Sequence, residues 1–227
     1  KPKYLNSSFI TTPDIAFEQA QLEVGRIGRR VCNMLNQLPP LAPVYATEKE
    51  REECMAQLKD IERIEEEVDT LHAAVLSYLG QLRTSPLTEF QSRRQIKLVS
   101  ITDQLESVAD IVVDTMLPLA YKAMNANIAI SEDMRKTIDT VQHRVDQSML
   151  DCVNAIRRGD DDLAKKVLNT KRELNSLLDA MLAHQAMRLQ DHDPERIRIF
   201  RYEMEWAESL KRVYTLTKRI AKQQLRK

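Results

Sequence analysis

The sequence predicts an all-α fold built from six helices in two tandem three-helix bundles. Glycine is scarce, at 4 residues in 227, and aromatic residues make up 5% of the chain. A sheet protein of this size would need more turn glycines and more β-branched or aromatic positions. Charged residues reach 30%, as expected for helices with an apolar stripe and a charged outer face. Apolar residues recur three, four or seven positions apart, which is the spacing of one helix face.

Three start signals define the helices of the first half. After a lead-in over residues 1–12 without periodicity, Thr12-Pro13 places a capping hydroxyl before a proline at the first helical position. Thr47-Glu48-Lys49-Glu50 is a capping box for the second helix. Ser85-Pro86 repeats the first pattern for the third helix. Pro118 should end or kink this third helix, because proline lacks the backbone N–H that a helix interior needs.

Three further signals define the helices of the second half. Ser131 starts the fourth helix, and Gly159 supplies a left-handed stop for it. Asp160 starts the fifth helix and Asp193-Pro194-Glu195 the sixth. The six starts give the same order of helix lengths twice, medium, long and long.

An internal repeat follows from this order. Leu58 to Leu82 is similar in pattern to Ala164 to Arg188, and Ile96 to Thr115 is similar to Arg201 to Ile220. We therefore divide the chain into the lead-in 1–12, a first three-helix repeat over 13–129 and a second three-helix repeat over 130–227.

Composition and motifs argue against several classes of protein. The 34 basic residues balance the 34 acidic ones, whereas a nucleic-acid binder has a basic excess. No Ser-His-Asp or Cys-His arrangement is readable, so we expect no enzyme activity. Gly25-x-x-Gly28 lies inside a helical pattern with no strand before it, so it predicts close helix packing and not a phosphate loop.

No apolar run approaches the ~20 residues of a membrane span. The chain starts with Lys1, however, so we expect a fragment or a processed product, and the part that preceded Lys1 could include such spans.

Two pairs of acidic residues are the candidate metal ligands. Glu65 and Asp69 lie four positions apart on the second helix, and Glu106 and Asp110 on the third, so each pair shares a helix face. Two such faces side by side supply four hard oxygen ligands for one divalent or trivalent cation. The alternative is a solvated face, because a chain with 34 acids contains several such pairs by chance. A di-iron enzyme is a further alternative, but its Glu-x-x-His spacing occurs only once, as Asp69-x-x-His72.

The last helix carries a basic face. Lys218, Arg219 and Lys222 are candidate contacts for an acidic partner or an anionic membrane surface. The alternative is again a solvated face.

Three segments resemble a known family. Glu106-Ser107-Val108-Ala109-Asp110 resembles the PhoU signature Glu-Arg-Ile-Gly-Asp, with Ser107 and Ala109 in place of the arginine and glycine. Glu65 and Asp69 resemble the acidic motif that precedes this signature. The lead-in, from Tyr4-Leu5 through Thr12-Pro13 to Glu23, resembles the join between the membrane part of bacterial sodium/phosphate cotransporters and their C-terminal PhoU-like domain.

The resemblance implies a cytoplasmic regulatory domain of a sodium-dependent phosphate transporter that acts in phosphate uptake control. The expected location is the cytoplasmic face of the bacterial inner membrane, as part of a membrane protein. The expected partners are the membrane part of the same transporter and further copies of the chain in a homo-oligomer, with no nucleic acid. The alternative is a free-standing PhoU-type metal-binding adaptor that acts in trans on a transporter or a sensor kinase.

The resemblance also implies one metal site, for iron or zinc, in the first repeat only. The second-half positions that match the four acidic residues are Lys171, Asn175, Lys211 and Thr215. A lysine cannot serve as a carboxylate ligand, so the second repeat cannot hold an equivalent site.

Overall fold

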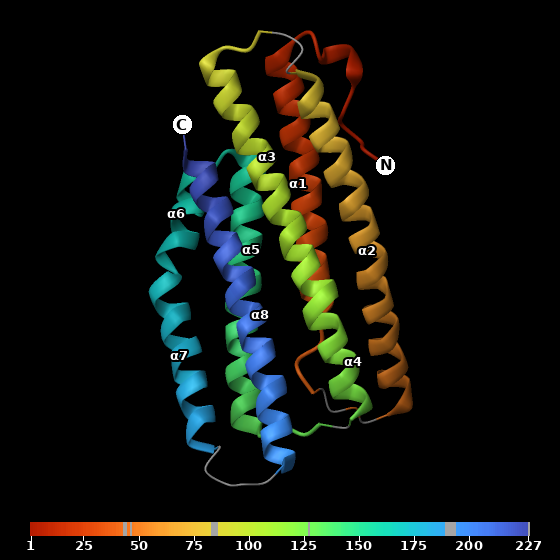
Figure 1. Ribbon diagram of the computed structural model, residues 1–227, viewed down its shortest axis with the longest axis vertical. Coiled ribbons are helices and arrows are strands. Elements are labelled where there is room, and N and C mark those ends of the chain that lie inside the picture. Colours follow the sequence, from red (N-terminus) through yellow and green to blue (C-terminus); the bar gives the residue numbers. More distant parts are fainter. Residues whose placement is uncertain (43–44, 46, 83–85, 127, 189–193, 227) are drawn as a thin grey trace.

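The computed structural model is a bundle of long helices that run close to one common axis (Figure 1). It describes residues 1–227 except 43–44, 46, 83–85, 127, 189–193 and 227. For residues 184–188 it describes the backbone but not the side chains. No strand occurs in the described residues. The elements are η1 (Ser7–Phe9), α1 (Pro13–Gln37), α2 (Glu48–Gln81), α3 (Glu89–Asp110), η3 (Ile111–Met116), α4 (Leu117–Asn125), α5 (Glu132–Arg158), α6 (Asp161–Asn169), α7 (Lys171–Arg188) and α8 (Pro194–Leu225).

The six predicted helices are confirmed as six helical rods. The segments α3, η3 and α4 follow one another without a break and form the third rod, and α6 and α7 form the fifth. Several predicted caps are also present. Thr47 accepts a hydrogen bond from the Glu50 N–H at 3.2 Å, and Ser131 accepts one from the Met134 N–H at 3.3 Å. Gly159 ends α5 with φ of 65°, the left-handed conformation that favours glycine.

Two of the predicted boundaries differ in the structure. The third helix begins at Glu89, not at Ser85-Pro86, because Thr88 and Gln91 form a reciprocal capping box there. Pro118 does not end the rod. A π-helical turn, η3, comes directly before it and shifts the hydrogen-bond register, so that Pro118 falls in the first turn of α4, where a missing N–H costs little. The predicted caps at Ser85 and Asp193 lie outside the described residues.

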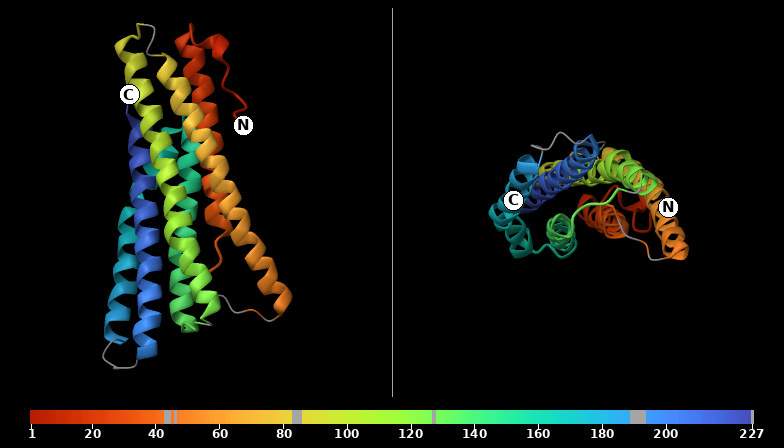
Figure 2. Two further views of the ribbon diagram at one scale, coloured as in Figure 1. Left: turned by 45° about the vertical axis from the view of Figure 1, so that its right-hand side comes forward. Right: turned by 90° about the horizontal axis from the view of Figure 1, so that it is seen from below.

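The helices form two layers. Figures 1 and 2 show α2, α3 with α4, α8, and α6 with α7 as one curved layer, with α1 and α5 behind it. The two halves contact each other along two seams, α1 against α5 and α3 against α8. One continuous apolar core runs through both halves. The largest fully buried side chain, Trp206, donates its indole N–H to Gln142 Oε1 at 3.1 Å, so the core leaves this polar group satisfied.

The α1–α5 seam depends on the two glycines of α1. A Cβ atom on Gly28 would lie 2.7 Å from Val153 Cγ2, and one on Gly25 would lie 2.6 Å from Arg157 Cγ. Both distances are far below van der Waals contact, so a side chain at either position would force the helices or the facing side chains apart. The predicted role of Gly25-x-x-Gly28 in close packing is therefore confirmed.

The predicted location, at the cytoplasmic face of the inner membrane as part of a membrane protein, is contradicted. Across the part of the chain that the structure describes, every helix is too short or too polar to cross a bilayer.

Candidate functional site

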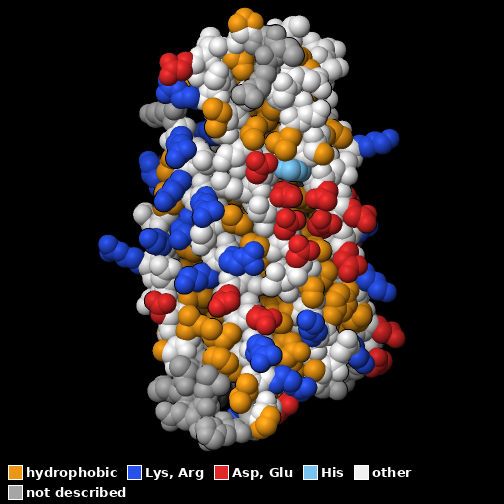
Figure 3. All heavy atoms as spheres, viewed as in Figure 1, with side chains coloured by type: hydrophobic (Ala, Val, Ile, Leu, Met, Phe, Trp, Pro, Cys, Tyr) orange, Lys and Arg blue, Asp and Glu red, His pale blue; other side chains and the backbone are white. Residues whose placement is uncertain are grey.

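The four predicted metal ligands lie on one surface. Glu65 and Asp69 project from α2, and Glu106 and Asp110 project from the neighbouring α3. Asp114, in the π-helical turn that follows, extends the row. Figure 3 shows the resulting patch of acidic side chains, with a histidine at its edge. We call these five residues the acidic cluster.

The carboxylates of the acidic cluster interact electrostatically across the two helices. Partial burial raises the pKa of Glu65, and Asp69, Asp110 and Asp114 raise it further through charge repulsion. Burial also raises the pKa of Asp110, with Asp114 and Asp69 as the next causes. These are side chains of different helices, so the two predicted acidic pairs form one electrostatic group.

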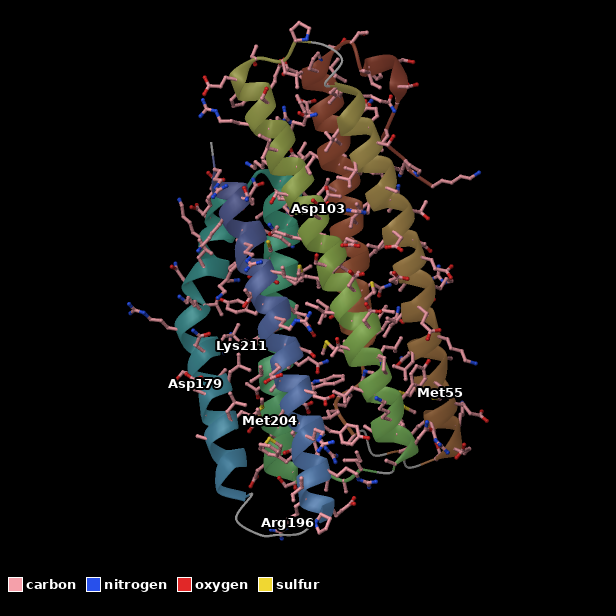
Figure 4. The ribbon with its side chains drawn as sticks, in the orientation of Figure 1. Met55, Asp103, Asp179, Arg196, Met204 and Lys211 are labelled. Atoms are coloured by element: carbon pink, nitrogen blue, oxygen red, sulfur yellow. The ribbon has the colours of Figure 1, made fainter. Side chains whose placement is uncertain are left out.

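His72 partly offsets this repulsion. Burial and then Asp110 raise the pKa of Glu106, whereas His72 lowers it. His72 Nε2 lies 2.9 Å from Asp103 Oδ1, which joins α2 to α3 at the end of the cluster. Figure 4 labels Asp103 on the face of α3 seen in that view.

The acidic cluster does not converge on a single point. Among the described residues, no group of three or more Asp, Glu, His or Cys side chains is placed so that it could hold one metal ion. The carboxylates are close enough to perturb one another but not arranged as a coordination shell. The chemistry of the donors suits a hard cation, and the geometry would require side chains to change rotamer around it.

The matching surface of the second half is basic. Lys171 lies 106 positions after Glu65, and Lys211 lies 105 positions after Glu106. With Lys218 and Lys222 of α8 they form what we call the basic cluster. Figure 3 shows cationic side chains over the opposite side of the same face from the acidic patch.

The lysines of the basic cluster are close enough to repel one another. Burial lowers the pKa of Lys218, and Lys171, Lys222 and Lys211 lower it further. The Lys218 ammonium lies 4.9 Å from the centre of the Tyr214 ring, a cation–π contact. Within the described residues, none of the four lysines forms an ion pair with a carboxylate.

A groove of about 670 Å³ separates the two clusters along the α3–α8 seam. Asp110 and Ser107 line it from α3, and Lys211, Arg212 and Arg219 line it from α8. The spacing of the basic residues predicts Arg219 on a partner face but gives no sign that it lies beside Asp110. Only the packing of α3 against α8 brings these oppositely charged residues to one groove.

The lead-in is fixed to α1 by a buried carboxylate. Glu23, fully buried, accepts hydrogen bonds at 2.8 Å from the backbone N–H groups of Lys3 and Tyr4 and pairs with Arg26. Tyr78 of α2 donates to the Asn6 carbonyl at 3.0 Å. Glu23 belongs to the stretch that resembles a transporter join, but its role as an anchor could not be read from the sequence, because nothing in the pattern marks it as buried.

No family model matches the chain. The chain is 27% identical over 177 residues to a candidate inorganic phosphate export protein, YjbB, of Salmonella typhimurium, and 25% identical over 177 residues to YjbB of Escherichia coli K12. Each alignment covers 78% of this chain and 31% of the relative, so the chain spans about a third of the length of the curated relatives it matches.

The fold is similar to two crystal structures of PhoU. The match to PhoU of Pseudomonas aeruginosa has a TM-score of 0.75 at 14% identity and covers 93% of this chain and 96% of that chain. The match to the phosphate transport system regulatory protein PhoU of Streptococcus pneumoniae has a TM-score of 0.75 at 12% identity and covers 94% and 95%. The chain therefore has a PhoU-like all-α fold and is similar in sequence to phosphate export proteins of the YjbB type.

Proposed function

We propose that the chain is a regulatory protein of the PhoU type that controls phosphate transport by binding a phosphate transport protein. The observation that carries the proposal is the basic cluster of α7 and α8, whose lysines have no carboxylate partner among the described residues. Charges held together without counter-charges favour association with an acidic surface. Lys218, Arg219 and Lys222 are the proposed contacts, and regulation by contact requires no catalytic residues.

We favour an adaptor that acts in trans over a domain of the transporter itself. The likeness to PhoU, the phosphate transport system regulatory protein of Streptococcus pneumoniae, covers 94% of this chain and 95% of that chain, which supports a regulatory role of the PhoU type. A sensor kinase is the other class of partner that this reading allows. Further copies of the chain, in a homo-oligomer, would present the same basic face more than once.

The acidic cluster is the proposed metal site, for one divalent or trivalent cation such as iron or zinc. Glu65, Asp69, Glu106 and Asp110 would be its ligands. Burial and then repulsion between neighbouring carboxylates raise the pKa values of Glu65, Glu106 and Asp110, and a bound cation would remove this repulsion. The second half has two lysines, an asparagine and a threonine at the matching positions and would hold no such metal.

A phosphate flux assay tests the proposed function. Bacterial cells that lack the gene for this chain would receive the wild type, a Lys218→Gln/Arg219→Gln/Lys222→Gln variant or no chain, and flux of labelled phosphate would be measured. We expect the triple variant to behave like the empty control, because its contact with the transport protein is weakened.

A matched control removes three charges elsewhere. Lys49, Arg51 and Lys59 are exposed on α2, far along the chain from α8, and a Lys49→Gln/Arg51→Gln/Lys59→Gln variant should restore normal flux. Full restoration of flux by the α8 triple variant, or unchanged flux in cells without the chain, would refute the proposal.

A further inference from the structure

We propose that the groove along the α3–α8 seam is a binding site for a phosphate group that carries a proton, either free monohydrogen phosphate or the monoanionic form of a phosphomonoester. The inference goes beyond the proposed function, because it concerns a small anion and not a partner protein. Arg212, Lys211 and Arg219 supply the positive side of the site. Asp110 and Glu208, which also line the groove, supply hydrogen-bond acceptors.

Among the residues that the structure describes, the three cations of the groove are not held in ion pairs. In the described residues, cations elsewhere are commonly paired with carboxylates, as in Arg30 with Glu67 at 2.7 Å and Arg144 with Glu173 at 2.8 Å. Lys211, Arg212 and Arg219 form no such pair in the part of the chain that the structure describes. A cationic group without a carboxylate partner is available to a dissolved anion.

The surroundings reinforce the positive potential. Lys211 is among the lysines whose charge lowers the pKa of Lys218, so the α8 side of the groove continues into the basic cluster. An anion in the groove would relieve this repulsion. Arginine is suited to the task, because its planar guanidinium donates two parallel hydrogen bonds to a tetrahedral oxyanion.

The internal repeat explains how the site arises. Lys211 stands where the first half has Glu106, and Arg219 lies 105 positions after Asp114. Two carboxylates of the first half are thus replaced by cations in the second. The acid at the corresponding outer position is retained, because Glu208 lies 105 positions after Asp103. The substitutions convert a surface suited to cations into one suited to anions.

The carboxylates of the groove select among anions. Asp110 and Glu208 would repel a fully ionised anion such as sulfate, which has no proton to share. Monohydrogen phosphate still carries a P–OH group near neutral pH, and this group donates a hydrogen bond to a carboxylate. The mixture of cations and carboxylates therefore fits a protonated phosphate better than it fits sulfate or a phosphodiester.

Isothermal titration calorimetry of the purified chain tests the proposal, with inorganic phosphate, glycerol phosphate and sulfate as separate titrants at one ionic strength. We expect saturable binding of phosphate or glycerol phosphate, and binding of sulfate weaker by about tenfold or more, equivalent to about 1.4 kcal/mol. The tighter of the first two titrants identifies the source as free phosphate or a phosphomonoester. Absence of saturable binding for both, or equal binding of sulfate, would overturn the site.

Variants assign the binding to the groove. Lys211→Gln/Arg212→Gln should weaken phosphate binding by about tenfold or more, whereas Lys49→Gln/Arg51→Gln on α2 should leave it unchanged. Glu208→Gln should reduce the preference for phosphate over sulfate. Lys211, Arg212 and Glu208 are exposed, so these changes leave the fold intact. Equal loss in the α2 control would contradict the assignment, and none of these variants alters the three residues tested by phosphate flux.

Discussion

The helix pair α2–α3 of the first half and the helix pair α7–α8 of the second share a buried pattern and differ on their outer surface. Val68 and its counterpart Leu174 are both buried, as are Leu105 and Leu210. Between these apolar positions, glutamate and aspartate in the first half give way to lysine, asparagine and threonine in the second. The apolar stripe holds the fold, and the outer rows diverge because they carry little of its stability.

This difference gives the matching outer rows of the two halves of one PhoU-like fold opposite charges, negative on the first half and positive on the second. Burial and then neighbouring carboxylates raise the pKa values of Glu65, Glu106 and Asp110, whereas burial and then neighbouring lysines lower the pKa of Lys218. Like charges repel one another within each cluster, so a ligand of the opposite sign would stabilise each of them. The α3–α8 groove lies where the two clusters meet.

The largest effect should come from disturbing the seam that holds the halves together. Gly28→Ala places a Cβ against Val153, so we expect a loss of about 1–3 kcal/mol in the free energy of unfolding. Chemical denaturation monitored by circular dichroism measures it. Gly80→Ala is the matched control, because a Cβ at Gly80 meets nothing within 4 Å. Gly80→Ala should stabilise the helix by about 0.5–1 kcal/mol. An equal change in the free energy of unfolding for the two variants would contradict the role of Gly28 in close packing at the α1–α5 seam.

A smaller effect on stability should come from the partly buried carboxylate of Asp146 in the second half. Burial raises the pKa of Asp146 on α5 to about 7, and its Oδ1 is shielded from solvent without a hydrogen-bond partner in the described structure. Because the folded-state pKa is above the ordinary value, the unfolded chain loses this proton first. Stability therefore falls as pH rises from about 4 towards 7 and stays low above 7.

Asp146→Asn should remove this fall. We expect a gain of about 1–2 kcal/mol at pH 8 and little change at pH 4, measured by denaturation at both pH values. A gain of equal size at both would show that the carboxylate charge is not the cause.

The smallest effect should come from single charges of the acidic cluster. Glu106→Gln removes one source of repulsion, so in the presence of a chelator it should raise stability at pH 7 by a few tenths of a kcal/mol, because these side chains are largely solvated. The raised carboxylate pKa values make stability fall as pH rises above about 4, and the variant should flatten this fall. Thermal unfolding over that range measures it. A stability loss at pH 7 would indicate that Glu106 forms a structural contact.

The fold could be predicted from local signals, but the groove could not. Six helices followed from caps such as Thr47, Ser131 and Asp160, whose side chains accept the expected N–H hydrogen bonds. The π-helical turn before Pro118 could not be predicted, because no sequence pattern distinguishes it from a kink. The start at Thr88 was missed because Ser85-Pro86 gave the same signal three residues earlier.

The residues of the acidic cluster were identified by spacing, and the structure brings all four predicted ligands to one face. Whether the four carboxylates can converge on one metal ion depends on their rotamers and on the distance between α2 and α3, and sequence spacing fixes neither. The placement of Asp110 and Arg219 in one groove needed the packing of α3 against α8, a contact between residues far apart in the chain.

Metal content of the purified chain is the most direct test of the difference between the halves. Elemental analysis would compare the wild type with Glu106→Ala/Asp110→Ala and with Lys211→Ala/Thr215→Ala, the matching pair of the second half. We predict stoichiometric iron or zinc in the wild type and in the second-half variant, and its loss in the first-half variant. Metal that is absent from all three folded proteins, or that the first-half variant retains, would contradict the assignment of the acidic cluster as the cation site.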